Sequence, residues 1–197
     1  MNIFFVSLGC DKNLVDSEMM ITSLRKDGFE IIDREEEADI IVVNTCCFIG
    51  DAKEESIQNI LEMAEYRKHG PCKALIVTGC LAQRYRQEVI DEIPEVDAVL
   101  GTNSFDKLIP AIRAALEKNE KSLILEPLEG FASEKGKRLL TTGGHYAYLK
   151  IAEGCDKHCT YCIIPKVRAN YRSVPMESLL QEAETLAEQG VKELILV

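Results

Sequence analysis

Three cysteines near residue 160 are the residues of this sequence best suited to chemistry. Cys155, Cys159 and Cys162 form a Cys-x₃-Cys-x₂-Cys run. A closed structural zinc or iron–sulfur site takes four protein ligands, so three thiolates leave one coordination position open for a reactant. The run therefore predicts a catalytic metal cluster. The alternatives are a structural zinc site that uses His158 as a fourth ligand, or three unrelated buried cysteines.

Three further cysteines occupy equivalent places after strand-like segments. Cys10, Cys46 and Cys80 each follow a short apolar run and a few small or polar residues. In a parallel sheet the carboxyl ends of all strands lie at one edge, where open α/β folds bind their ligands. Each cysteine also precedes a predicted helix, whose N-terminal dipole favours a thiolate or an anionic cluster. We expect the three to converge in a second metal site. Three separate core cysteines are the alternative.

The remaining two cysteines are assigned by the same geometry. Cys72 precedes its predicted strand, which places it at the opposite edge of the sheet, away from the metal site. Cys47 adjoins Cys46, and neighbouring residues of an extended chain point to opposite sides. We expect Cys47 to be a spectator, with a role as substitute ligand as the alternative.

The elements that position these residues alternate between apolar runs and helical patterns. Such alternation predicts an α/β fold with a mostly parallel sheet. Gly28 and Gly70 mark two helix ends, and Ser104 is expected to cap the last helix. One buried helix stripe is predicted at Ile57, Ile60, Leu61 and Ala64. The expected pairs of strand and helix are Ile3–Ser7 with Asp16–Lys26, Ile40–Asn44 with Asp51–Lys68, Ala74–Thr78 with Leu81–Glu92, and Ala98–Leu100 with Phe105–Lys118.

A second unit begins after a weakly patterned stretch. We expect an N-terminal α/β domain over residues 1–118, a linker over 119–142, which contains the short apolar run Leu123–Leu125, and the start of a (βα) barrel over 143–197. One and a half βα units cannot close a barrel. The sequence therefore predicts a piece of a longer enzyme. The expected elements of the second unit are strand Tyr146–Ala152, helix Met176–Gln189 and strand Glu193–Val197.

Composition narrows the class of protein. The chain has 197 residues, 46% of them hydrophobic, and eight cysteines. It has neither a secretory signal nor a run long enough to span a membrane, so we expect a cytoplasmic protein whose cysteines serve metal binding or catalysis rather than disulfides. The formal net charge of −10 argues against direct binding of nucleic acid by this chain, and it leaves a basic protein partner open.

The Cys155 run, with Tyr161 before its last cysteine, resembles the cluster loop of radical S-adenosylmethionine (SAM) enzymes. That resemblance implies that Cys155, Cys159 and Cys162 hold a [4Fe-4S] cluster whose open iron binds SAM. It also implies that Tyr161 lies beside the adenine. Cluster and SAM would then carry the radical chemistry, while the protein supplies ligands and placement.

Motifs along nearly the whole chain resemble the methylthiotransferases of that superfamily. They are Ser-Leu-Gly-Cys-x-Lys-Asn-Leu-Val-Asp-Ser-Glu from Ser7, Asn-Thr-Cys-x-Phe-Ile from Asn44, Thr-Gly-Cys-Leu-Ala-Gln-Arg from Thr78, and the Cys155 run itself. The resemblance implies that Cys10, Cys46 and Cys80 bind a second [4Fe-4S] cluster, which carries the sulfur. The family's Arg-Gly-x-x-Arg-Ser-Arg appears as Arg-Ala-Asn-Tyr-Arg-Ser-Val over 168–174, which keeps two of its three arginines.

The first motif is similar to the branch of the family that acts on an aspartate of protein twelve of the small ribosomal subunit. This likeness implies transfer of a methylthio group to the aspartate β-carbon, with an electron donor and a sulfur source as further partners. The alternatives are a tRNA adenosine methylthiotransferase and a non-catalytic iron–sulfur electron carrier. Electron carriers generally close each cluster with four protein ligands, so sets of three cysteines favour an enzyme.

Overall fold

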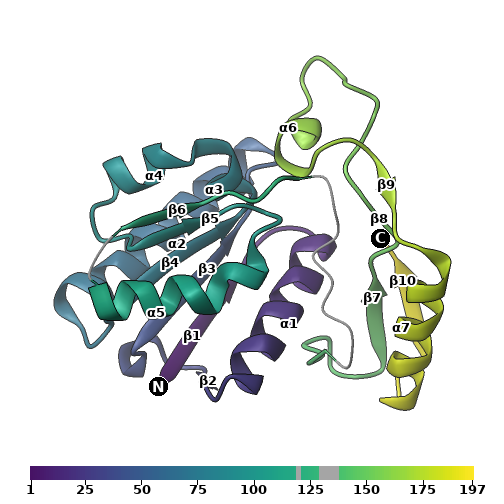
Figure 1. Cartoon of the computed structure of the whole chain (residues 1–197), viewed down its shortest axis with the longest axis horizontal. Helices are drawn as coiled ribbons and strands as arrows, with labels where there is room; N and C mark the ends of the chain where they lie inside the picture. Colours follow the sequence, from purple (N-terminus) through teal and green to yellow (C-terminus); the bar gives the residue numbers. More distant parts are fainter. Residues whose placement is uncertain (119–120, 129–137) are drawn as a thin grey trace.

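The computed structural model describes residues 1–118, 121–128 and 138–197. A six-stranded sheet with helices on both faces forms the larger part, and a smaller unit of strands and helices lies beside helix α1 (Figure 1). The strands are β1 (Asn2–Ser7), β2 (Glu30–Ile32), β3 (Ile40–Thr45), β4 (Ala74–Gly79), β5 (Ala98–Leu100), β6 (Ser122–Ile124), β7 (Tyr146–Leu149), β8 (Ala152–Glu153), β9 (Arg172–Ser173) and β10 (Glu193–Leu196). The helices are α1 (Asp11–Lys26), α2 (Gly50–His69), α3 (Cys80–Tyr85), α4 (Gln87–Glu92), α5 (Leu108–Lys118), α6 (Ile164–Arg168) and α7 (Met176–Glu188), with 3₁₀ turns η1 (Glu35–Glu37) and η2 (Phe105–Lys107).

The large sheet confirms the predicted parallel α/β fold. Its strand order is β2-β1-β3-β4-β5-β6, and every neighbouring pair is parallel. All residues of β3 and β4 are buried, as expected for central strands covered on both faces. The continuous apolar runs at Ile40–Val43 and Ala74–Val77 are therefore a consequence of double coverage.

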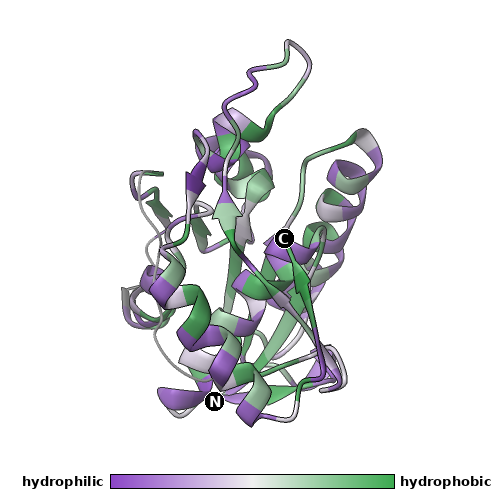
Figure 2. Cartoon of the chain, turned by 90° about the vertical axis from the view of Figure 1, so that its right-hand side faces the viewer, coloured by the Kyte–Doolittle hydropathy of each residue, from purple (hydrophilic) through white to green (hydrophobic). Residues whose placement is uncertain are grey.

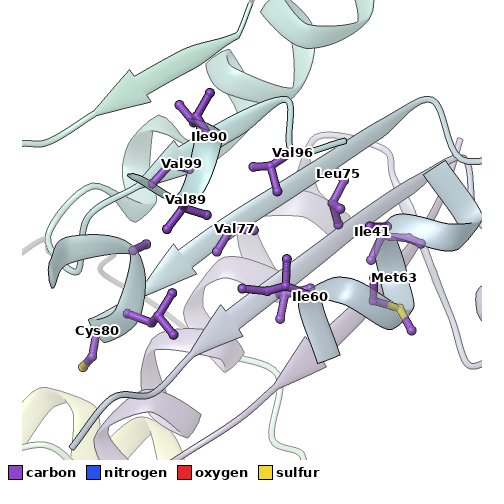
Figure 3. Close-up of a cluster of buried hydrophobic side chains, with 14 of the residues drawn as sticks. Ile41, Ile60, Met63, Leu75, Val77, Cys80, Val89, Ile90, Val96 and Val99 are labelled. Carbon is purple, nitrogen blue, oxygen red and sulfur yellow. The ribbon is translucent and has the colours of Figure 1, made fainter. Parts of the chain in front are cut away.

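Helices on the two faces of the sheet enclose separate cores. On one face, α2 and α4 supply Ile60, Met63, Val89 and Ile90, which pack over side chains of β3, β4 and β5 (Figure 3). On the other face, α1 and α5 cover the alternate strand residues. The strands are mostly hydrophobic and the helices mix hydrophobic and hydrophilic positions (Figure 2). Burial of these apolar side chains supplies the main stabilisation, at about 25 cal/mol per Å².

The second unit contains a βαβ arrangement. Strands β7 and β10 are parallel, and α7 lies between them in sequence. Ala147, Leu149, Leu186 and Val191 form its small core. The predicted strand over 146–152 is divided, because β8 leaves β7 and pairs antiparallel with β9.

Several local predictions need correction. The first helix begins at Asp11 rather than Asp16. The helix predicted over 81–92 breaks into α3 and α4 at Arg86, whose φ is 51°. The break lets α3 stay over the ends of β3 and β4 while α4 packs on β5.

Two predictions about individual side chains were also wrong. Ser104 does not cap its helix; its hydroxyl accepts a hydrogen bond from the Glu126 amide at 2.9 Å. On α2, Ile57 and Leu61 are 38% and 45% exposed. The buried stripe of that helix is instead formed by Ser56, Ile60, Met63 and Ala64. The helix ends at Gly28 and Gly70 are confirmed.

The expected linker over 119–142 lies partly outside the described residues. Where it is described, it contributes β6, which pairs with β5 and extends the first sheet beyond residue 118. Further on, Arg138, Leu139 and Thr141 hydrogen-bond to α1. Among the described residues, no helix combines the length and the apolarity that a membrane crossing requires.

Ala169 has a backbone conformation that suits glycine. Its φ is 62° and its ψ is −166° at the end of α6. Residues other than glycine rarely adopt this φ/ψ region, because the backbone strain costs them about 1–3 kcal/mol.

We predict that Ala169→Gly raises the free energy of unfolding by about 1 kcal/mol, because relief of strain exceeds the added chain entropy. Chemical denaturation of the full-length protein measures it. Ala187→Gly, on an exposed turn of α7, is the control and should lower stability by about 1 kcal/mol. Equal losses for both variants would contradict the strain at Ala169.

Candidate metal centres

Cys10, Cys46 and Cys80 follow three adjacent strands of the parallel sheet. β3 lies between β1 and β4, and the register pairs Ser7 with Asn44 and Thr45 with Gly79. Cys10 is the N-cap residue of α1, and Cys80 is the first residue of α3. The strand ends therefore bring the three cysteines to one edge of the sheet, which we call the strand-end site.

Close backbone contacts fix the position of Cys46. The Cys46 amide donates to the Ser56 hydroxyl at 2.9 Å, and that hydroxyl donates back to the Cys46 carbonyl at 2.8 Å. Gly9 lies on the other side of Cys46. A Cβ added to Gly9 would lie 2.6 Å from the Cys46 Cβ and 2.9 Å from the Cys46 sulfur. The Gly9 in the first motif thus leaves room for the Cys46 side chain.

The strand-end site is open at one side and closed at the other. Cys10 is exposed, whereas Cys46 and Cys80 are 5% and 7% exposed. Burial raises the pKa of the Cys80 thiol to about 12, and the Arg168 guanidinium beside it acts in the opposite direction. Metal binding at Cys80 must therefore displace a proton.

Asn13 connects the three strand ends. Its side-chain amide donates to the carbonyls of Leu8 and Thr45, both at 2.9 Å. Its Oδ1 accepts from Arg168 and lies 3.9 Å from the Cys80 sulfur. Sequence reasoning assigned Asn13 no role of its own. A polar residue on the buried face of a helix is the signal that could have identified Asn13. The predicted helix began at Asp16, five residues too late to include it.

The rest of the polar motif binds the second unit. Asp16 accepts from Lys150 at 2.5 Å and from Arg168 at 3.1 Å, and Glu153 pairs with the same two cations at 3.0 and 2.7 Å. Burial alone would raise the pKa of Glu153, but Arg168 and Lys150 hold it below its ordinary value. Lys12 adds a bond to the Ala152 carbonyl at 2.6 Å.

Another cation, Arg138, pairs with α1 farther from the strand-end site. Arg138 donates to Glu18 at 2.8 Å and also binds Glu182 and the Tyr148 carbonyl. The other carboxylate oxygen of Glu18 accepts from the amide and hydroxyl of Thr141. One helix thus presents an apolar face to the sheet and a polar face to the second unit.

The run of Cys155, Cys159 and Cys162 forms a loop between β8 and α6. The Cys162 amide donates to the Cys159 carbonyl at 3.0 Å, and the Cys155 amide donates to Ala169 at 3.1 Å. Cys159 is exposed, and the other two cysteines are partly exposed. Tyr161, predicted to lie beside adenine, is 90% exposed, so its ring is accessible to a ligand.

The donor chemistry of both sets fits an iron–sulfur cluster. All eight cysteines are free thiols. Within the described ranges, no three cysteine, histidine or acidic side chains are grouped tightly enough to hold a single metal ion. A four-iron cluster takes one thiolate per iron, which requires more widely spaced sulfurs than one ion does. Three thiols leave one iron of a four-iron cluster free of protein, so the type and number of donors in each set fit such a cluster.

Comparison with known proteins places the chain in a family. The family described as "Uncharacterized protein family UPF0004" matches residues 2–101, which include all of the strand-end site. The chain belongs to this family.

Curated relatives of this UPF0004 chain share one name, "Ribosomal protein uS12 methylthiotransferase RimO". That of Lachnoclostridium phytofermentans is 62% identical over 197 residues, covering 100% of this chain and 44% of the relative. Those of Clostridium tetani and Desulforamulus reducens are 55% and 50% identical, over 98% and 100% of this chain and 43% and 44% of the relatives. The chain thus spans less than half the length of these relatives.

The two remaining cysteines of the UPF0004 chain lie in different surroundings. Cys72 is buried before β4, at the amino ends of the strands, and its thiol contacts the Ala74 carbonyl at 3.3 Å. Cys47 is buried beside α3, with its thiol 3.2 Å from the Cys80 carbonyl. Burial raises the pKa of both thiols, that of Cys72 to about 11. Cys47 thus stands next to the strand-end site, whereas Cys72 stands at the other end of the sheet.

Gly79 offers a direct test of how tightly the strand-end site is built. Its φ is 92°, and an added Cβ would meet Asn44 Oδ1 and lie 2.5 Å from the Thr45 carbonyl oxygen. Gly28 has a similar φ of 89° but no atom within 4 Å of an added Cβ.

We predict that Gly28→Ala costs about 1 kcal/mol of stability from backbone strain alone. Gly79→Ala should cost about 1–3 kcal/mol more, because the methyl group pushes β3 and β4 apart beside Cys80. Denaturation curves of the two variants measure the difference. Equal losses would mean that the strand ends can separate freely.

Proposed function

We propose that this chain is the N-terminal part of a radical-SAM methylthiotransferase that modifies an aspartate β-carbon of ribosomal protein uS12. The observation that carries the proposal is the pair of three-cysteine sets, one on the edge of the sheet and one on the loop after β8, joined through the polar face of α1. The names of the relatives, which match the chain over almost its whole length, support the substrate.

In this proposal each set of thiols holds one [4Fe-4S] cluster. Cys155, Cys159 and Cys162 would bind the cluster that takes SAM, with the exposed ring of Tyr161 against the adenine. Cys10, Cys46 and Cys80 would bind the cluster from which sulfur is transferred. When bound, these groups supply the one-electron and sulfur chemistry, and the chain supplies ligands and orientation.

The same proposal divides the chain into an α/β domain over 1–118, a connecting stretch over 119–142 that gives β6 to the sheet of this domain, and the start of the radical-SAM barrel over 143–197. The reaction needs an electron donor and a sulfur source from outside the chain. We place the enzyme in the cytoplasm, because eight cysteines without disulfide bonds suit a reducing compartment.

The test uses full-length, anaerobically reconstituted enzyme with SAM and a reductant, offered uS12 and tRNA in separate reactions. We predict a methylthio group on an aspartate of uS12, detected by mass spectrometry, and none on tRNA. The wild-type protein should hold about eight irons, four per site. Product on tRNA alone would assign the enzyme to the other branch, and zinc with little iron would rule out both.

Replacing each set of cysteines separates the two roles. Protein with Cys10, Cys46 and Cys80 changed to Ala should still cleave SAM to 5′-deoxyadenosine, yet form no methylthiolated uS12. Protein with Cys155, Cys159 and Cys162 changed to Ala should cleave no SAM, and each triple variant should lose roughly half the iron. Cys72→Ala is the matched control and should keep full iron content, because Cys72 lies at the other end of the sheet.

A further inference from the structure

A short segment at the end of α6 touches both cysteine sites. The Ala169 carbonyl accepts the hydrogen bond of the Cys155 amide, and Gly154 comes so close to the carbonyls of Ala169 and Asn170 that an added Cβ would collide with them. Two residues before Ala169, α6 also contacts the first unit: the Thr102 hydroxyl donates to the Val167 carbonyl at 2.7 Å. The backbone of this segment therefore links the Cys155 loop to the large sheet (Figure 1).

Arg168 lies in the middle of this segment, and its two guanidinium arms have different partners. Nη1 pairs with Asp16 at 3.1 Å and with Glu153 at 2.7 Å, which fastens the second unit to α1. Nη2 donates to Asn13 Oδ1, and the same oxygen lies 3.9 Å from the Cys80 sulfur, so Asn13 joins this arm of Arg168 to Cys80. The Arg168 side chain is only 5% exposed, so water screens its charge poorly.

We propose that Arg168 is a positioning residue that couples the two cysteine sites, with one arm docking the second unit and the other setting the charge beside Cys80. The inference rests on the proposed function, since it takes Cys80 as a cluster ligand. A cluster held by thiolates becomes more negative on reduction, and a nearby buried cation favours that state. Arg168 should therefore raise the reduction potential of the strand-end cluster.

Arg138 provides a matched control at the same interface. It is equally buried and also pairs with one carboxylate of α1 and one of the second unit, Glu18 and Glu182. Its partner Glu18 lies more than one helical turn beyond Asn13. Arg138→Met thus removes a buried cation from the interface without removing one from beside Cys80.

The experiment is a redox titration, followed by electron paramagnetic resonance, of the full-length reconstituted protein. The strand-end signal is identified as the one that disappears when Cys10, Cys46 and Cys80 are replaced by Ala. We expect the midpoint potential of this signal to fall in Arg168→Met and to stay unchanged in Arg138→Met. Arg168→Lys should show a smaller fall, because one ammonium can keep the pairing with Asp16 and Glu153 but has no second arm for Asn13.

Hydrogen exchange gives a second measurement on the same proteins. Amides of residues 154–162 should exchange faster in Arg168→Met than in Arg138→Met, because only Arg168 adjoins the carbonyl that holds the Cys155 amide. If Arg168→Met does not fold, the potential and exchange of Arg168→Lys decide the question.

Wild-type potentials in the Arg168 variants that fold would overturn the inference. An equal fall of the midpoint potential in Arg138→Met would also overturn the inference, because the shift would then come from general loosening of the interface and not from the charge beside Cys80. A wild-type protein that contains iron but gives no strand-end signal would instead overturn the proposed function, and this inference with it.

Discussion

The ion pair between Asp16 and Arg168 is the contact on which the arrangement of the two cysteine sites depends. Asp16 belongs to the helix that follows Cys10, and Arg168 belongs to the helix that follows Cys162. Each partner is thus a few residues from a cysteine of its own set. A shift of either helix would break the pair, so the pair ties the edge of the sheet to the Cys155 loop.

Burial gives this ion pair a large desolvation cost that opposes the attraction between its charges. Charges removed from water lose several kcal/mol of solvation each, and the attraction between partners only roughly offsets that loss. Each of these buried cations pairs with one carboxylate of α1 and one of the second unit. Lys150 and Arg168 pair with Asp16 and Glu153, and Arg138 pairs with Glu18 and Glu182. Removal of one charge would leave its partners with fewer counter-charges, at part of the about 3–5 kcal/mol that a fully unpaired buried charge costs. The network therefore specifies one way of docking the two units.

Much of the fold was predictable because its signals are local. The continuous apolar runs of β3 and β4 predicted central parallel strands, and the topology of such a sheet then predicted that Cys10, Cys46 and Cys80 would meet at one edge. Strand β2 and the role of 122–124 as β6 escaped notice, because three-residue strands at the sides of a sheet carry almost no pattern. The start of α1 was misplaced for a related reason. Asn13, Asp16, Ser17 and Glu18 look like solvent-facing residues, and only a partner distant in sequence explains their burial.

The roles of Asn13 and Arg168 could not be deduced from spacing, because their contacts cross 155 positions of sequence. The cysteine motifs by contrast predicted two sets of donors directly from spacing and strand ends. What the structure adds is the physical link between those sets, from β1, β3 and β4 through Asn13 and Arg168 to the Cys155 loop.

Iron anomalous scattering from crystals of the reconstituted full-length protein tests the central claim most directly. Difference maps from data collected on either side of the iron absorption edge would locate the metal without assumptions about activity. The account predicts two separate iron peaks, one bounded by the sulfurs of Cys10, Cys46 and Cys80 and the other by those of Cys155, Cys159 and Cys162. A single peak, or a first peak bounded by Cys47 in place of Cys46, would contradict it.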